Sequence, residues 1–370
     1  MSSLALIDIS ALLQPISEEN MIGEDIRNDT SPTSLYAEIK DARNSARAAE
    51  RNSVFDGGST EAIDNWNKVA VIAPQILSTH SKDVEVACWY TEALIRKGGF
   101  QGLRDGFSLI RQLIEQYWAE GLYPQEDEDG TETRVAPISG LNGEGAEGVL
   151  LAPIRNTCIT DDVQPGPFSL WQYKQAVDAK RMSDAKARAE QLSKIGFSMD
   201  DIDRAVEQSS SNYFGNLRDD VTTALAEYRQ ISRLLVEYCG SYEAPSTRKI
   251  IDLLEETLGA INHIAKHKFP AEPISEDLAD GEKATSTPVN KSTTGLPSNA
   301  PESREEAFRQ LAIISDFFRK TEPHSPISYA LDRAVNWGEM SLHELINELI
   351  PDSSSRTTYS SLTGVRMHDD

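Results

Sequence analysis

The chain has 370 residues, of which 39% are apolar and 26% are charged, and its formal net charge is −23. This length suits about two or three globular domains. Affinity for phosphate backbones and anionic headgroups comes mainly from Lys and Arg, so the acidic balance argues against nucleic acid as a partner.

Membrane insertion and secretion are not expected from the sequence. Its apolar runs are all shorter than the roughly 20 residues that cross a bilayer. The first residues lack a basic segment and carry Asp8 within their apolar part, which is atypical of a signal peptide. Cys88, Cys158 and Cys239 lie far apart without a CxxC pair, as expected for reduced thiols. We therefore expect a cytoplasmic protein without a membrane-inserted segment.

Helical periodicity dominates residues 1–270. A short apolar stripe begins at Trp66 and is expected to close at Pro74. Longer stripes recur at three- and four-residue steps over 103–117, 217–235 and 250–264, each typical of one buried helix face. Alternating strand patterns are scarce. The predicted fold class is all-α, with one helical domain at 1–167 and a second at 168–270.

Residues 124–167 are rich in Gly, Pro and acidic residues and predict a long ordered loop or a domain boundary. "GEGAEG" at 143–148 has the spacing of a dinucleotide fingerprint. However, Glu144 and Glu147 stand where phosphates would bind, and a turn is the better interpretation. "QEDEDG" at 125–130 resembles a calcium loop that lacks two of its ligands. An acidic solvated loop or a partner-binding surface is the default for Glu126, Asp127, Glu128 and Asp129.

Metal and cofactor sites are not predicted. His263 and His267 share one helix face, but two imidazoles make an incomplete zinc site. Both lie near a helix C-terminus, where polar and cationic side chains are favoured. We interpret them as helix-end residues.

Residues 271–303 contain almost no large apolar side chains and are rich in Pro, Ser, Thr and Gly. Such a segment cannot offset its ordering entropy, so we expect a flexible linker of about 30 Å between its ends. It separates the two helical domains from a small helical module at 304–370 with a frayed tail.

The C-terminal module shows three short amphipathic helices. Pro323 and Gly338 are expected to end the first and second of them. Their apolar stripes are Phe308, Leu311, Ser315 and Phe318, then Ile327, Ala330, Leu331, Ala334 and Trp337, then Leu342, Leu345, Ile346 and Leu349. This pattern predicts a packing module.

The turn between the first two of these helices holds Glu322, His324 and Ser325, the residue types of an acyl-transfer triad. Pro323 and Pro326 restrict the backbone, and a G-x-S-x-G elbow is missing from the sequence. A joint between helices, with Ser325 as a helix cap, fits more residues. A hydrolase that uses this turn stays an alternative.

Three stretches closely resemble the ImpA N-terminal domain, which TssA-family components of type VI secretion systems carry. They are "PISEENMIGEDIRND" at 15–29, the run from "SKDVEVACWY" to "APISGLNG" at 81–143, and "LLAPIRNTCIT" at 150–160. The resemblance covers about residues 8–160. The segment at 317–350 is similar to the tail of the shorter class of the family.

The resemblance implies a non-enzymatic cytosolic assembly factor of a contractile injection machine. Such proteins form ring-like multimers and contact baseplate and sheath–tube proteins and, in some systems, the membrane complex. Short-form members are likened to baseplate components, whereas longer members cap the distal end and escort sheath growth. We expect the baseplate role, with the distal cap as the alternative.

Taken with this resemblance, the C-terminal stripes predict that residues 304–350 join copies of the chain. Phe318 and Trp337 are the expected anchors, because aromatic side chains dominate interface energetics. Leu345 extends the apolar face, and Arg319, Glu322 and His324 are the expected polar rim. The acidic loop Glu126–Asp129 is the expected contact for another secretion component.

Overall fold

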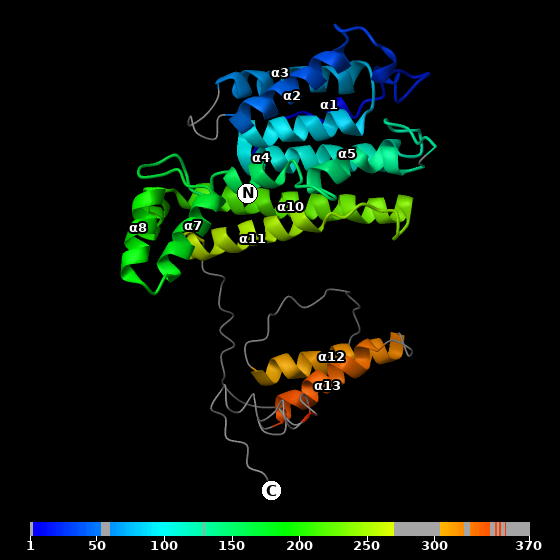
Figure 1. Ribbon diagram of the computed structural model, residues 1–370. Helices are drawn as coiled ribbons and strands as arrows, with labels where there is room; N and C mark the ends of the chain where they lie inside the picture. The colour runs from blue at the N-terminus through cyan, green and yellow to red at the C-terminus, as the bar shows by residue number, and fades with distance from the viewer. Residues whose placement is uncertain are drawn as a thin grey trace, which may run out of the picture. The chain divides into compact units, whose positions relative to one another are not determined.

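The computed structural model describes residues 3–52, 60–128, 130–269, 304–321 and 326–340, together with Leu345, Glu348 and Asp352. The chain forms two compact units, Met1–Glu276 and Asp277–Asp370 (Figure 1). Within the described ranges the elements are helices, and strand-like pairing is limited to isolated bridges. The all-α prediction is confirmed. The domain division at residue 167 stays a prediction, and the linker at 271–303 lies outside the described residues.

The first unit contains both short and long helices. They are α1 (Ile9–Leu12), η1 (Ile26–Asn28), α2 (Leu35–Asn52), α3 (Thr60–Thr79), α4 (Val84–Tyr117), α5 (Glu132–Asn142), α6 (Leu151–Asn156), α7 (Leu170–Arg181), α8 (Ala185–Ile195), α9 (Met199–Gln208), α10 (Ser211–Cys239), α11 (Arg248–Ile264) and η3 (Lys266–Lys268). The second unit contains α12 (Arg304–Thr321) and α13 (Ile327–Glu339).

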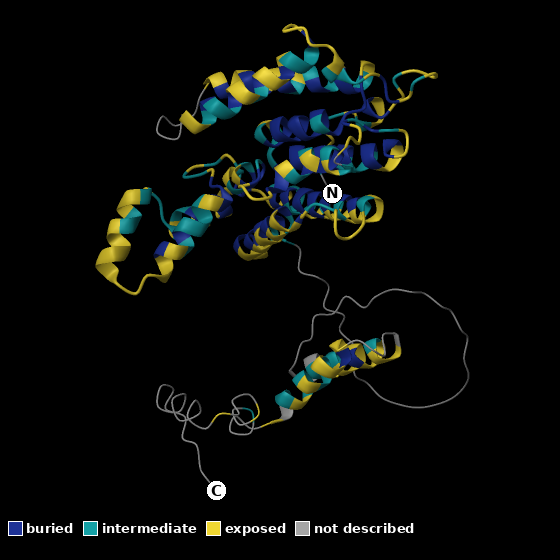
Figure 2. Cartoon of the chain, turned by 45° about the vertical axis from the view of Figure 1, so that its right-hand side comes forward, coloured by how far each residue is buried: buried dark blue, intermediate teal, exposed yellow. Residues whose placement is uncertain are grey.

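Helix α4 is the central element of the first unit. It packs against α3 on one side and against α10 on the other, while α2 covers α3 and α11 covers α10 (Figure 1). Of its 34 residues, 23 are buried. A helix that is buried on all sides typically lies at the centre of a helical core. Figure 2 shows the contrast with α8, which has no buried residue.

Short polar residues set the starts of the helices that follow α6. Ser169 and Ser198 begin α7 and α9 with capping boxes, in which the serine and the third helical residue satisfy each other's backbone donors. Asp184 and Ser210 cap α8 and α10 through their side chains. Gly196, at φ +81°, ends α8 in the left-handed conformation that glycine adopts without strain.

The three long stripes predicted from the sequence are confirmed as buried faces. Leu103, Phe107 and Ile110 of α4 are fully buried, and the ring of Phe107 lies 4.6 Å from that of Tyr228 on α10. The predicted stripe of α10 is buried along its whole length, and that of α11 except for the partly buried Leu258.

The prediction of an irregular segment at 124–167 is wrong in part, because α5 and α6 form within it. Val135, Ile138 and Leu141 of α5 are buried, and α5 packs against α4 and α11. This burial outweighs the cost of Pro137 inside the helix. Pro153 stands in the first turn of α6, where a backbone donor is not needed. The turn predicted at 143–148 is confirmed as a series of bends.

Pro74 does not close its helix as expected, since α3 continues to Thr79. Ile76 and Leu77, two and three residues after the proline, are fully buried, and their packing holds the helix together across the missing hydrogen bond.

In the second unit, α12 and α13 pack as a helical hairpin. The hydroxyl of Ser315 is buried and donates to the carbonyl of Ser328 at 2.8 Å. Gly338 does not end α13, which runs to Glu339. A Cβ atom at Gly338 would lie 2.1 Å from the ring of Phe308, so the glycine permits this close packing.

Candidate protein-binding sites

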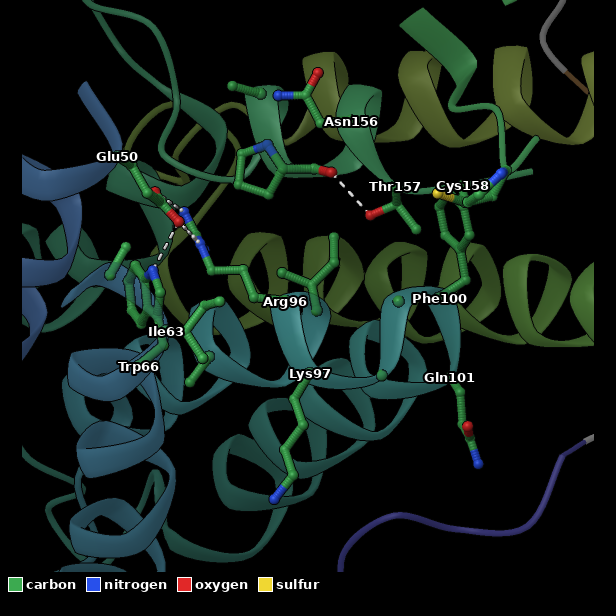
Figure 3. A pocket seen from close by; sticks show the side chains of 18 of the residues that line it. Glu50, Ile63, Trp66, Arg96, Lys97, Phe100, Gln101, Asn156, Thr157 and Cys158 are labelled. Carbon is green, nitrogen blue, oxygen red and sulfur yellow. Dashed lines mark hydrogen bonds and ion pairs between the residues drawn. The ribbon is translucent and has the colours of Figure 1, made fainter. Parts of the chain in front are cut away.

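A groove of about 1660 Å³ opens beside the middle of α4. Its walls come from the end of α2, the first turns of α3, the bend in α4, α6 and the start of α10 (Figure 3). At the bend, Gly98 and Gly99 leave the helical conformation, and Gly99 has a φ of +56°. The groove is larger than the roughly 300–1,000 Å³ typical of small-molecule pockets.

One end of the groove is lined by arginines. Arg47 and Arg51 of α2 and Arg96 of α4 line it, and together with the neighbouring Arg43 of α2 we call them the arginine cluster. The three residues of α2 are four apart, so they share one helix face. Arg96 lies 4.0 Å from the ring of Trp66.

Two members of the arginine cluster have a carboxylate partner. Arg43 donates to the Oε1 atom of Glu92 at 2.7 Å, and Arg96 donates to both oxygens of Glu50 at 2.6 and 2.9 Å. Trp66 also donates to Glu50, at 2.7 Å (Figure 3). Burial raises the pKa of Glu92, and the positive charge of Arg43 opposes that shift.

The other two members of the arginine cluster, Arg47 and Arg51, have no carboxylate partner within the described ranges. Arg47 and Arg51 make neither a hydrogen bond nor an ion pair within the described ranges, and the same holds for Lys97, which also lines the groove. Arg47 is half-buried. Burial lowers its pKa, and the nearby Arg43, Arg51 and Arg96 lower it further, while Glu92 acts in the opposite direction. The cluster therefore carries uncompensated positive charge in a chain whose net charge is −23.

The predicted acidic loop lies on the surface at the start of α5. Glu126, Asp127 and Glu128 are exposed, and Asp129 lies outside the described residues. Glu126 forms an ion pair with Arg134 at 3.2 Å, and Asp127 accepts a hydrogen bond from Thr133 at 2.6 Å. These contacts hold the loop against α5. Glu128 takes no part in them and is exposed to solvent. Groups of acidic, His or Cys residues that suit a metal ion are absent from the described part of the chain.

The α12–α13 hairpin exposes a large part of its apolar surface. The side chains of Ile313, Phe317 and Tyr329 are 62%, 59% and 69% exposed, and Ile327 is exposed at the start of α13. Among the described residues of the second unit, the only fully buried side chains are those of two serines, Ser315 and Ser328. Within its described residues, the hairpin thus exposes apolar surface and buries no apolar side chain completely.

The predicted interface residues fall on this hairpin or next to it. Phe318 and Trp337 are half-buried, and Leu345 is helical and half-buried. Arg319 is exposed and pairs with Asp316 and Asp332 within the hairpin. Trp337 lies under Arg333, 5.2 Å from its guanidinium. Glu322, His324 and Ser325, including the alternative catalytic turn, lie outside the described residues.

Sequence reasoning missed two sets of residues. Ile313 and Phe317 are four apart on α12, beside the predicted stripe rather than in it. The arginines of α2 also repeat every four residues in "ARNSARAAER". That four-residue spacing predicts a positively charged helix face. The fold is needed to show that Arg96 and Glu92 of α4 lie next to this face.

None of the helices in the described ranges is both long and apolar enough to cross a bilayer. The described ranges define an all-helical protein with an acidic loop, an exposed apolar hairpin face and an arginine-lined groove.

Comparisons with known proteins agree with this class. Residues 13–143 match the family described as ImpA, N-terminal, type VI secretion system. The chain is similar to the type VI secretion system component TssA1 of Pseudomonas aeruginosa, with 23% identity over 364 residues that cover 95% of this chain and 97% of the relative. In fold it is similar to the N-terminal domain, including the conserved ImpA_N region, of the TssA component from Burkholderia cenocepacia. That match has a TM-score of 0.56 and 24% identity, and covers 70% of this chain and 94% of the other. Residues 13–143 therefore form an ImpA-type N-terminal domain, and the chain is similar along almost its whole length to a TssA component of type VI secretion systems.

Proposed function

We propose that this chain is a non-enzymatic assembly component whose copies join through the α12–α13 hairpin into a ring. The observation that carries the proposal is that the described residues of the hairpin expose apolar surface and bury no apolar side chain completely. Covering a side chain such as Phe317 or Ile313 in an interface contributes about 1.5–3 kcal/mol. A closed ring covers this surface by making the same heterologous contact in every copy.

The proposed ring stands at the baseplate of the secretion apparatus, in the cytoplasm next to the inner membrane, and contacts baseplate and sheath–tube proteins. Similarity along almost the whole of both chains supports the same general organisation as in TssA1. In this proposal, residues 271–303 link the first unit to the ring-forming module. If each copy makes one weak contact, a ring gains avidity through effective concentration.

Secretion by living cells tests this function. We expect that cells without the chain stop releasing the tube protein of the apparatus, and that the native chain restores release. A chain with Ile313→Asp and Phe317→Asp should accumulate normally but fail to restore it. Val71→Asp, which changes an exposed apolar residue of the first unit, is the matched control and should restore release. Full restoration by the double variant would contradict the proposal.

Position in the cell distinguishes the two assembly roles. A fluorescent fusion that stays at one point of the membrane while the sheath extends supports the baseplate role. A fusion that travels with the growing end supports the distal cap and contradicts the baseplate role.

The acidic loop provides a second proposed contact, with another protein of the apparatus. Glu128 is exposed at its tip, and the Arg134 and Thr133 contacts orient Glu126 and Asp127. Charge reversal at Glu128 should weaken co-purification of baseplate or sheath proteins, because complementary charges favour encounter. The rival interpretation, that the loop only covers α5, predicts unchanged co-purification and a loss of stability instead.

A further inference from the structure

The arginine cluster at the groove has more positive charge than the fold uses. It contains four guanidinium groups, and Glu92 and Glu50 compensate two of them. Arg47, Arg51 and Lys97, which also lines the groove, make no hydrogen bond or ion pair with a carboxylate within the described ranges. Like charges held close together destabilise each other. An anion at this end of the groove would therefore bind favourably.

The shape and the apolar walls of the groove indicate which kind of anion it suits. Ile63, on the α3 wall, is 61% exposed, and Trp66 and Ala70 lie on the same helix. The groove offers apolar contact next to charge, and its volume of about 1660 Å³ exceeds what a small anion needs. Nucleic acid is disfavoured, because the rest of this chain is strongly acidic.

The spacing of the arginines matches one backbone conformation of an acidic peptide. Residues four apart on a helix are separated by about 6 Å along its axis. Alternate residues of an extended strand are about 6.6 Å apart and point to the same side. Carboxylates on alternate residues of an extended segment thus have about the same spacing as Arg47 and Arg51. The side chains between them point to the other side of the segment, where an apolar one can contact Ile63.

We propose that this groove docks an extended acidic segment of a partner protein, with Asp or Glu on alternate residues and an apolar side chain against Ile63. Arg47 and Arg51 donate to successive carboxylates, and Lys97 adds charge from the α4 side of the groove. The inference is independent of the proposed ring, because every residue it uses belongs to the first unit.

Fluorescence anisotropy of the full-length chain tests the proposal directly. The probe is a fluorescein-labelled synthetic peptide with Glu at every second position and Ser or Leu at the positions between. One comparison peptide carries Gln in place of Glu, and another has the same composition with its Glu residues contiguous. We expect saturable binding of the alternating peptide, weakening with salt, and much weaker binding of the other two.

Arg47→Gln with Arg51→Gln is the decisive variant. Neither arginine has a partner within the described ranges, so the fold should keep its unfolding midpoint. Binding should weaken roughly tenfold for each charge-assisted hydrogen bond that the substitution removes. Lys186→Gln with Arg188→Gln, two exposed cations of α8, is the matched control and should bind as the native chain does.

Three results would overturn the proposal. The first is an equal decrease of binding in the α2 and α8 variants, which would reflect general attraction by positive charge. The second is equal affinity for the alternating and contiguous peptides. The third is a change in the mass of the oligomer on substitution of Arg47 and Arg51 without peptide binding, because another copy of the chain would then occupy the groove.

Discussion

Replacing Arg104 by methionine tests the buried charge network that joins the N-terminal residues to α4 and α10. Its guanidinium donates to Asp105 at 2.8 Å and to Asp220 of α10 at 2.5 Å. It also donates to the backbone carbonyls of Ser3 and Leu4, at 2.9 and 3.1 Å. The side chains of Arg104, Asp105 and Asp220 are only 8%, 4% and 5% exposed. Methionine keeps most of the side-chain volume but leaves both carboxylates without their counter-charge.

The expected cost follows from this burial. Removing one partner of a buried ion pair costs about 3–5 kcal/mol, because the remaining charge is left uncompensated in a poorly solvated place. That is a large share of the roughly 5–15 kcal/mol by which domains are stable. Arg111→Met, on the same helix, is the matched control. Its side chain is 20% exposed and its partners Glu115 and Glu227 are 41% and 17% exposed, so its replacement should cost less than that of Arg104.

Urea unfolding followed by circular dichroism measures both free energies. We expect a clearly lower midpoint for Arg104→Met than for Arg111→Met, and faster protease cleavage near residues 3–6. Equal destabilisation by the two variants would refute the claim that burial decides the strength of these ion pairs.

Three further predictions concern residues of the first unit. Burial lowers the pKa of Lys82 to about 8, against 10.5 ordinarily, so the unfolded chain binds more protons within this window. The free energy of unfolding of the native chain should therefore rise with pH in this window. Urea unfolding of Lys82→Met should show no such rise. An equal rise in this variant would contradict the assignment of the effect to Lys82. Gly102→Ala should lower the thermal midpoint, because its Cβ would lie 2.0 Å from the carbonyl oxygen of Leu94, whereas Gly215→Ala has open space and should be neutral or stabilising. Phe107→Ala should cost about 3–5 kcal/mol in urea unfolding, and a cost below 1 kcal/mol would mean that the core refills the space beside Tyr228.

The long helices were predictable because their apolar residues keep the helical period along the whole element. Leu103, Phe107 and Ile110 occupy one face of α4, and the core lies on that face. The period does not show that the opposite face of α4 is buried as well. Burial on both sides depends on α3 and α10, which lie outside this stretch of the sequence and pack on α4.

Helix α5 shows why local signals were insufficient. Pro137 and Gly140 are typical of loops, and the sequence around them is acidic. The helix is stabilised by burial of Val135, Ile138 and Leu141 against α4 and α11, and α11 begins more than a hundred residues later. Tertiary packing of this kind regularly overrides intrinsic propensity.

The candidate sites differ in how far the sequence revealed them. The C-terminal hairpin was expected from its stripes, but the exposed face at Ile313 and Phe317 depends on how α12 turns toward α13. For the groove, the sequence shows only the spacing of Arg43, Arg47 and Arg51. The pairing of Arg43 with Glu92, which leaves Arg47 unmatched, joins residues 49 positions apart and requires the fold.

The mass of the full-length chain in solution, measured by light scattering at micromolar concentration, tests most directly whether copies assemble through the α12–α13 hairpin. One copy has a mass of 40.9 kDa. The native chain should scatter as a particle several times heavier, and so should Val71→Asp. The chain with Ile313→Asp and Phe317→Asp should scatter as a single copy. A native chain that stays at 40.9 kDa, or a double variant that keeps the large particle, would contradict this mode of assembly.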